Sequence, residues 1–130
     1  MAEENINKDG ENLPHRIICL SKSMSGTAFS LELHDKIKFV IGRSPDADIH
    51  IVQLPISGKH CAITKHEDET LSIEDLKSTN GTYVNGLRIS GRTELNDGDI
   101  IALGDFEMIY RSHGSKNQPN RSILTTTTVN

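Results

Sequence analysis

Short alternations of apolar and polar residues run through the middle of the chain, and turn residues separate them. Residues 29–33 and 37–41 alternate with a period of two, which is typical of half-buried β-strands. The polar turn between them predicts that the two strands form a hairpin. Apolar residues nowhere keep a helical spacing over ten residues without a glycine or proline. About ten short strands are therefore predicted, as in an all-β sandwich or a closed barrel.

Three further hairpins are predicted, each from two apolar runs separated by turn residues: 61–64 with 71–76, 82–84 with 87–89, and 100–103 with 106–110. Asn85-Gly86 gives the strongest of these signals, because both residues tolerate the positive φ of a two-residue hairpin turn. Residues 16–20 and 49–51 are predicted to be strands as well. Pro55 excludes a central strand that continues beyond the second of them.

The ends of the chain differ from its middle in composition. Residues 1–14 are acidic and polar without apolar periodicity, and residues 113–130 are rich in serine, asparagine and threonine. Such segments do not bury enough apolar surface to fold. We expect a disordered N-terminal lead at 1–14, a single domain at 15–112, and a flexible tail or linker at 113–130.

Bulk composition narrows the function. A chain of 130 residues can form one self-sufficient core, and its net charge of −4 argues against a nucleic-acid partner. No segment approaches the roughly 18 apolar residues of a membrane span, and the first residues lack the apolar core of a secretory signal. We expect a cytoplasmic protein, or a nuclear one in a eukaryote. Cys19 and Cys61 lie in apolar runs and are expected to be buried free thiols.

Three polar clusters next to predicted strands contain groups that bind anions: residues 41–44, 56–60 and 78–82. The guanidinium of Arg43 can donate two charge-assisted hydrogen bonds to a phosphate. The hydroxyl of Ser57 and the backbone amide of Gly58 suit phosphate oxygens as well. Taken singly, each cluster also fits a surface arginine or an ordinary turn.

Catalytic and metal-binding explanations have weaker support. A hydrolase with Ser57 as nucleophile and His60 as base would lack a nucleophile elbow and a third orienting group. The segment 97–99 is too short a series of oxygen ligands for a calcium loop, and the histidines and cysteines do not have zinc spacing. The chain has no nucleotide-binding glycine motif. We therefore expect no enzyme activity, no metal and no cofactor.

The order of the clusters is more specific than any one of them. Gly42-Arg43, Ser57-x-x-His60, Asn80-Gly81 and Asn85-Gly86, in this sequence on a β pattern, resemble the forkhead-associated (FHA) domain. The resemblance covers roughly residues 16–112. It implies a β-sandwich of about eleven mainly antiparallel strands. Loops at one end would bind phosphothreonine in partner proteins of Ser/Thr kinase pathways.

The resemblance also implies a role for individual residues. Arg43 and Ser57 would bind the phosphate, and Thr79 would contact the phosphothreonine region. Asn80 would hold the peptide backbone. Two residues would add to the phosphate contacts, Gly58 through its amide and Lys59 through its charge. The remaining motif residues would shape the loops: Gly42, His60, Gly81, Asn85 and Gly86.

Two positions bear on selectivity. Many relatives have a larger polar or basic residue at the position of Gly58, so one side-chain contact to phosphate is missing here. Pro55 and Ile56 fall where relatives often read the third residue after the phosphothreonine. Their apolar character points to an aliphatic preference there.

Two alternatives stay open from the residues alone. The domain could be a phosphate-independent scaffold that uses a sheet face or an edge strand. We expect a monomer, but Thr125–Thr128 in the tail offer phosphorylation sites that could bind the same domain or a second copy. A plain linker is the simpler explanation of the tail.

Overall fold

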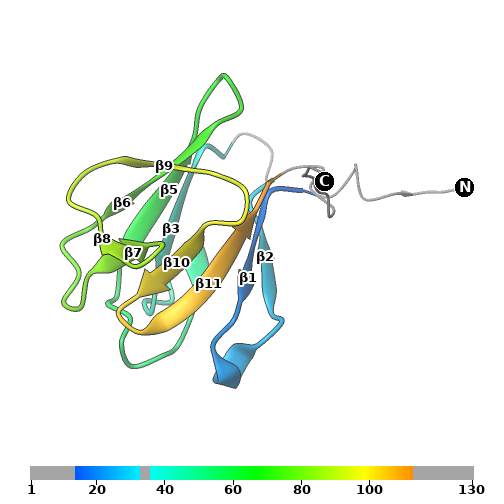
Figure 1. Cartoon of the computed structure of the whole chain (residues 1–130). Coiled ribbons are helices and arrows are strands. Elements are labelled where there is room, and N and C mark those ends of the chain that lie inside the picture. The colour runs from blue at the N-terminus through cyan, green and yellow to red at the C-terminus, as the bar shows by residue number, and fades with distance from the viewer. Residues whose placement is uncertain (1–13, 33–35, 113–130) are drawn as a thin grey trace, which may run out of the picture.

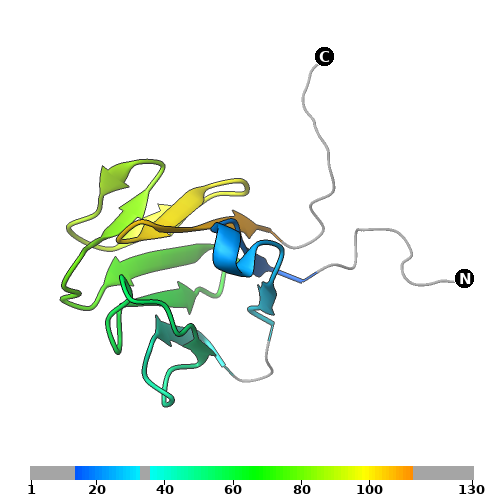
Figure 2. The same cartoon turned by 90° about the horizontal axis from the view of Figure 1, so that it is seen from below.

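The computed structural model describes residues 14–32 and 36–112, and in this part of the chain eleven strands form two sheets that pack face to face (Figures 1 and 2). The six-stranded sheet has the order β2 (Ala28–Ser30), β1 (Arg16–Cys19), β11 (Phe106–Arg111), β10 (Ile100–Leu103), β7 (Thr82–Val84) and β8 (Leu87–Arg88). The five-stranded sheet has the order β4 (Ile49–His50), β3 (Lys38–Gly42), β5 (Cys61–Lys65), β6 (Leu71–Asp75) and β9 (Thr93–Leu95). Only β3 and β4 pair in parallel among the paired strands of the described residues. The prediction of a mainly antiparallel sandwich of about eleven strands is confirmed, and the closed barrel is not formed.

The core lies between the two sheets and follows from the period-two alternation. In β1, Ile17 and Cys19 are fully buried, whereas Ile18 between them is half-buried on the outer face. The five-stranded sheet contributes the fully buried side chains Phe39, Ile41, Ile63, Leu71 and Ile73, and the six-stranded sheet contributes Ile101, Leu103 and Met108. Burying one such side chain stabilises a fold by about 1.5–3 kcal/mol. The sandwich is therefore a rigid base for the loops at its ends.

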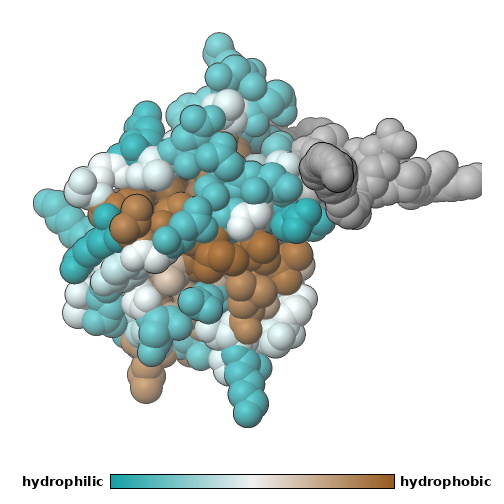
Figure 3. All heavy atoms as spheres, viewed as in Figure 1, coloured by the Kyte–Doolittle hydropathy of each residue, from teal (hydrophilic) through white to brown (hydrophobic). Residues whose placement is uncertain are grey.

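The outer face of the six-stranded sheet carries an apolar area over β1, β11 and β10 (Figure 3). Ile109 in β11 lies opposite Ile18 in β1 on one side and Ile100 in β10 on the other. All three side chains are half-buried. Cross-strand neighbours of this kind stabilise the sheet through side-chain contact.

The hairpin predicted from residues 29–33 and 37–41 is wrong. β2 pairs with β1 in the six-stranded sheet, and β3 pairs with β4 and β5 in the other sheet. The chain therefore changes sheets between β2 and β3. Alternation shows that a strand buries one face. It does not show which sheet the strand joins, because a strand in either sheet of a sandwich buries one face. The true partner of β2 is reached through the loop that contains the short 3-10 helix at Lys22–Met24.

The other predicted hairpins are confirmed: β5 with β6, β7 with β8, and β10 with β11. Strand β9 was not predicted, because its three residues carry little apolar signal. Cys19 and Cys61 are free and buried, as expected, and burial raises the pKa of both thiols.

Some expectations fall where the structure gives no description. The N-terminal lead, apart from Pro14, and the whole tail with Thr125–Thr128 lie outside the described residues. No helix in the described part of the chain is long and apolar enough to cross a membrane.

Candidate functional site

The loop after β3 and the loop before β5 are joined by backbone hydrogen bonds. The Arg43 amide donates to the Ser57 carbonyl oxygen at 2.9 Å, and the Ser44 amide donates to the Gly58 carbonyl oxygen at 3.0 Å. Gly42 permits this close approach, because a Cβ there would overlap the Gly58 carbonyl oxygen. The first two predicted clusters therefore lie side by side.

The side chain of Arg43 is anchored at one point and open at its tip. Its Nε donates to the carbonyl oxygen of Ile56 at 2.9 Å, and its own carbonyl oxygen is bonded to Nε2 of His50 at 3.1 Å. Within the described residues, its two terminal nitrogens make no hydrogen bond. The residue is exposed, so these N–H groups are available to an anion beside Ser57.

His60 joins the second cluster to the third. Its Nδ1 accepts the Ser57 amide proton at 3.1 Å, so its Nε2 carries the proton that is donated to the Gly81 carbonyl oxygen at 2.9 Å. The ring is fully buried, and this burial lowers its pKa. His60 is therefore a neutral cross-link between two loops. Neither ring nitrogen is left to take a proton from the Ser57 hydroxyl.

The hydroxyl of Ser57 faces the third cluster. Its Oγ accepts the backbone amide of Thr79 at 3.0 Å, and its own proton is left to donate elsewhere. Gly58 and Lys59, which follow in the same loop, are exposed, as is Thr79. The amide, hydroxyl and ammonium groups of this loop are thus accessible from solvent next to Arg43.

A half-buried carboxylate that was not predicted as a site residue shapes the loop between β6 and β7. Oδ1 of Asp75 accepts the hydroxyls of Ser78 at 2.6 Å and Thr82 at 2.7 Å. Ser78 Oγ in turn accepts the Gly81 amide at 2.9 Å. Burial opposes ionisation of Asp75, but these hydrogen bonds outweigh it and lower its pKa. An acidic residue that ends a strand three positions before a serine was the available signal.

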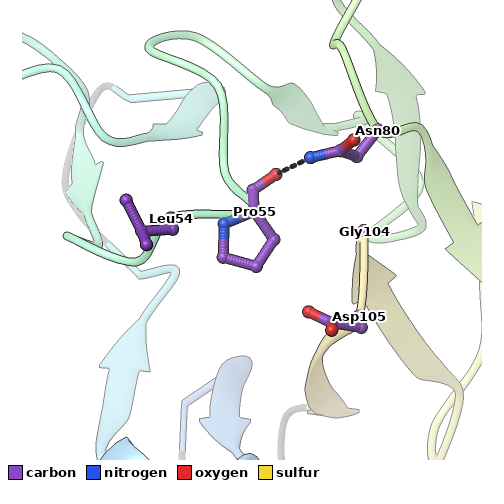
Figure 4. Close-up of a pocket in the computed structure, with 5 residues that line it drawn as sticks. All are labelled: Leu54, Pro55, Asn80, Gly104 and Asp105. Atoms are coloured by element: carbon purple, nitrogen blue, oxygen red, sulfur yellow. Dashed lines mark hydrogen bonds between the residues drawn. The ribbon is translucent and has the colours of Figure 1, made fainter.

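Asn80 projects from this loop toward the loop before β5. Its Nδ2 donates to the carbonyl oxygen of Pro55 at 2.9 Å, and the residue is otherwise exposed. Next to it lies a hollow of about 460 Å³ that is lined by Leu54, Pro55, Asn80, Gly104 and Asp105 (Figure 4). The amide of Gly104 donates to the Gly81 carbonyl oxygen at 2.9 Å, which ties the β10–β11 turn to the same group of loops.

Two predicted motif residues lie apart from these contacts. Asn85 and Gly86 form the turn between β7 and β8, with φ of 52° and 85°. The Asn85 side chain accepts the Ile100 amide and donates to Asp99, so it attaches this hairpin to the start of β10. They stabilise the scaffold and do not line the hollow.

Arg88 was not predicted, yet its side chain borders the site. Its Nε lies 2.9 Å from the place that a Gly81 Cβ would occupy, so the glycine leaves room for the guanidinium. Gly81 has a φ of 89°, which also favours glycine. Among the described residues, no group of three or more side chains could hold a metal ion.

Comparison with known proteins identifies the family to which this chain belongs. The family model "FHA domain" matches residues 39–104, which include all three clusters. The chain belongs to the FHA domain family. This FHA chain is 36% identical over 121 residues to a probable serine/threonine-protein kinase, fhkA, of Dictyostelium discoideum, with 78% of the chain and 20% of the kinase covered. It therefore spans about a fifth of the length of that relative.

Two further similar proteins match most of this chain over most of their own length. The oxoglutarate dehydrogenase inhibitor of Corynebacterium jeikeium is 32% identical over 106 residues, which cover 82% of the FHA chain and 72% of the inhibitor. A solved structure from work on phosphothreonine-dependent FHA domain interactions superposes with a TM-score of 0.66 at 31% identity. That superposition covers 76% of the FHA chain and 96% of the other. The resemblance inferred from the motif order is confirmed.

Proposed function

We propose that this FHA domain binds phosphothreonine segments of partner proteins and so recruits phosphorylated partners in Ser/Thr kinase signalling. The observation that carries the proposal is the interlocking of three loops around Arg43 and Ser57. The loops hold Arg43 and Ser57 next to each other through a backbone hydrogen bond, and Asn80 projects from the third loop. The likeness to an FHA domain with phosphothreonine-dependent interactions supports the same function.

Phosphate is the group that can use this arrangement. It carries a charge of about −1.5 to −2 at neutral pH and three acceptor oxygens. The free N–H groups of Arg43, the hydroxyl proton of Ser57 and the exposed amide of Gly58 supply matching donors. An unmodified threonine hydroxyl would leave the guanidinium without a counter-charge.

Magnitudes indicate that the phosphate acts as a switch. A hydrogen bond to a charged group contributes roughly 1.5–3 kcal/mol, and micromolar binding amounts to about 8 kcal/mol. Losing two or three such bonds therefore removes most of the affinity. Binding should depend on a kinase acting on the partner.

The remaining site residues complete the proposal. Asn80 pairs with the peptide backbone through the amide groups that Pro55 does not use. Thr79 contacts the region of the phosphothreonine, and Lys59 adds positive charge at the edge. Catalysis is not part of the proposal, because His60 uses both ring nitrogens to join loops.

Substitution of Arg43 tests the function directly. Arg43→Ala should weaken binding to phosphothreonine peptides, selected from an oriented library, by about 100-fold or more in calorimetry, because two charge-assisted bonds are lost. Arg92→Ala is the matched control, since Arg92 is also exposed but does not belong to these loops. It should bind as the wild type does, and both variants should unfold near the wild-type temperature.

Two results would contradict the proposal. The first is an Arg43→Ala variant that binds the peptides as tightly as the wild type. The second is wild-type binding that survives phosphatase treatment of the peptide, which would favour a phosphate-independent scaffold instead.

A further inference from the structure

The hollow beside Asn80 has walls of opposite character. Leu54 and Pro55, in the loop before β5, form an apolar wall, and Leu54 is 90% exposed. Asp105, in the turn between β10 and β11, lies across from them, and its carboxylate points into the space on their side (Figure 4). Asp105 is the one charged residue among those that line the hollow.

We propose that this hollow binds a lysine or arginine side chain of the phosphorylated partner. The partner would then carry a basic residue a few positions from its phosphothreonine. This inference rests on the proposed function, because Asn80 borders the hollow and would hold the backbone of the same peptide. It differs from the aliphatic preference expected from Pro55 and Ile56 alone.

The apolar wall suits the stem of such a side chain. Lysine and arginine lay their methylene groups along apolar surface and keep the charged end in water. The side chain of Leu54 offers such a surface, because it is almost wholly uncovered. Gly104 keeps the space between the walls open. A Cβ at this position would come within 3.0 Å of Pro55 Cβ and 3.1 Å of Asn80 Cβ.

The carboxylate of Asp105 favours a positive charge at the end of the ligand side chain. Within the described residues, the Asp105 side chain makes no hydrogen bond and no ion pair, so it is available to a ligand. A cation at the end of an aliphatic stem would pair with it, whereas an acidic side chain would be repelled. An aliphatic side chain would contact Leu54 and gain nothing from Asp105. Dependence on Asp105 therefore separates the two preferences.

The expected effect is modest, because the pair stays exposed to solvent. Exposed ion pairs strengthen binding only slightly, and apolar contact of the stem adds to this. A peptide with lysine at the right position should bind about three- to tenfold more tightly than the alanine peptide. The preference should shrink as salt is added, since salt screens exposed charges.

The experiment compares phosphothreonine peptides that carry lysine, leucine, glutamate or alanine at each flanking position. Wild-type protein should prefer lysine at one of these positions and disfavour glutamate there. Asp105→Asn should lose this preference and bind the alanine peptide as the wild type does. Glu67→Gln is the matched control, because Glu67 is exposed on the distant β5–β6 turn, and it should keep the preference.

Charge reversal at Asp105, which is exposed in the β10–β11 turn, gives a second readout. Asp105→Lys should favour glutamate over lysine at the same peptide position. A lysine preference that persists in Asp105→Asn, or a leucine preference in the wild type, would overturn the inference and leave phosphothreonine binding intact. If no phosphothreonine peptide binds at all, the proposed function itself is wrong.

Discussion

The loop end of the domain has two parts that are built differently. In the first, here called the interlocked loops, Gly42, Arg43, Ser57, His60 and Gly81 each take part in a contact between two loops. The second is the hollow beside Asn80. Two of its exposed side chains, Leu54 and Asp105, make no hydrogen bond among the described residues.

Because of this difference, we assign affinity to the interlocked loops and selectivity among partners to the hollow. Donors that are held in place before the ligand arrives lose little entropy on binding, so the interlocked loops suit a phosphate that every ligand carries. Side chains without internal partners can differ without loss of the fold, so the hollow suits recognition of what varies among partners. Substitutions of the buried members of the interlocked loops, Gly42, His60 and Gly81, should change stability and affinity together. Substitutions of Leu54 or Asp105 in the hollow should change only the preference among peptides.

The largest effect is expected where two backbones meet. Gly42→Ala would place a Cβ on the Gly58 carbonyl oxygen, and backbone atoms cannot move aside cheaply. Overpacking of this kind costs about 1–3 kcal/mol or more, so the unfolding temperature should fall by roughly 10 °C or more. Phosphopeptide binding should fall with it, because Arg43 is the next residue.

Gly58→Ala is the matched control on the other side of the same contact. A Cβ at position 58 would meet only Ser44 Cβ, at 3.9 Å, so the unfolding temperature should change by no more than a few degrees. Thermal unfolding of both variants decides the matter. Equal stability of the two would mean that the loops are not packed as closely as described.

A comparable effect on stability is expected from the cross-link between loops. His60→Ala removes two hydrogen bonds and leaves a space in the interior, which together cost about 2–4 kcal/mol. It should also weaken phosphopeptide binding about tenfold, although His60 would not touch the ligand. Denaturant unfolding and calorimetry measure the two effects.

His50→Ala is the control for His60→Ala, because it shows what the loss of an exposed imidazole costs. The ring of His50 is exposed and makes one bond, to the carbonyl oxygen of Arg43. Its removal should cost less than about 0.5 kcal/mol. If His60→Ala lowered stability but left affinity unchanged, the interlocked loops would not be what holds the binding groups in place.

The sequence was a good guide where local pattern decides the outcome. Alternation located most strands, and polar turns, two of which contain glycine, located three hairpins correctly. It failed for β2 and β3, because pairing in a sandwich depends on which sheet a strand joins, and period two is the same in both. Strand β9 was missed, since it depends on pairing with β6 and has little apolar signal of its own.

The order of the site motifs along the chain could be predicted, but the contacts between their residues could not. Motif spacing singled out Arg43, Ser57 and Asn80, which the structure brings to neighbouring loops. Asp75 and Asp105 were passed over, since an acidic residue at a strand end or in a turn is ordinary until its neighbours are known. The proposed basic preference differs from the aliphatic one expected from Pro55 and Ile56 for the same reason, as the opposite wall of the hollow lies 50 residues beyond Pro55 along the chain.

The smallest expected effect concerns pH and tests whether the cross-link needs a neutral ring. Burial lowers the pKa of His60 in the folded state below the ordinary value of about 6.5. Above about pH 6.5 the ring is neutral in both states, so its full contribution to stability is present. As the pH falls below that value, the unfolded state binds a proton that the folded state resists, and stability declines toward the lower folded pKa.

The unfolding temperature should therefore fall between about pH 7 and about pH 5.5 by a few degrees. His60→Gln should show a flatter dependence over the same range, because glutamine does not titrate. The other histidines are the same in both proteins, so the difference between the two curves isolates His60. Parallel curves would mean that the buried ring accepts a proton without disturbing the loops. The interlocked loops would then owe their order to the backbone contacts of Gly42 and not to the imidazole.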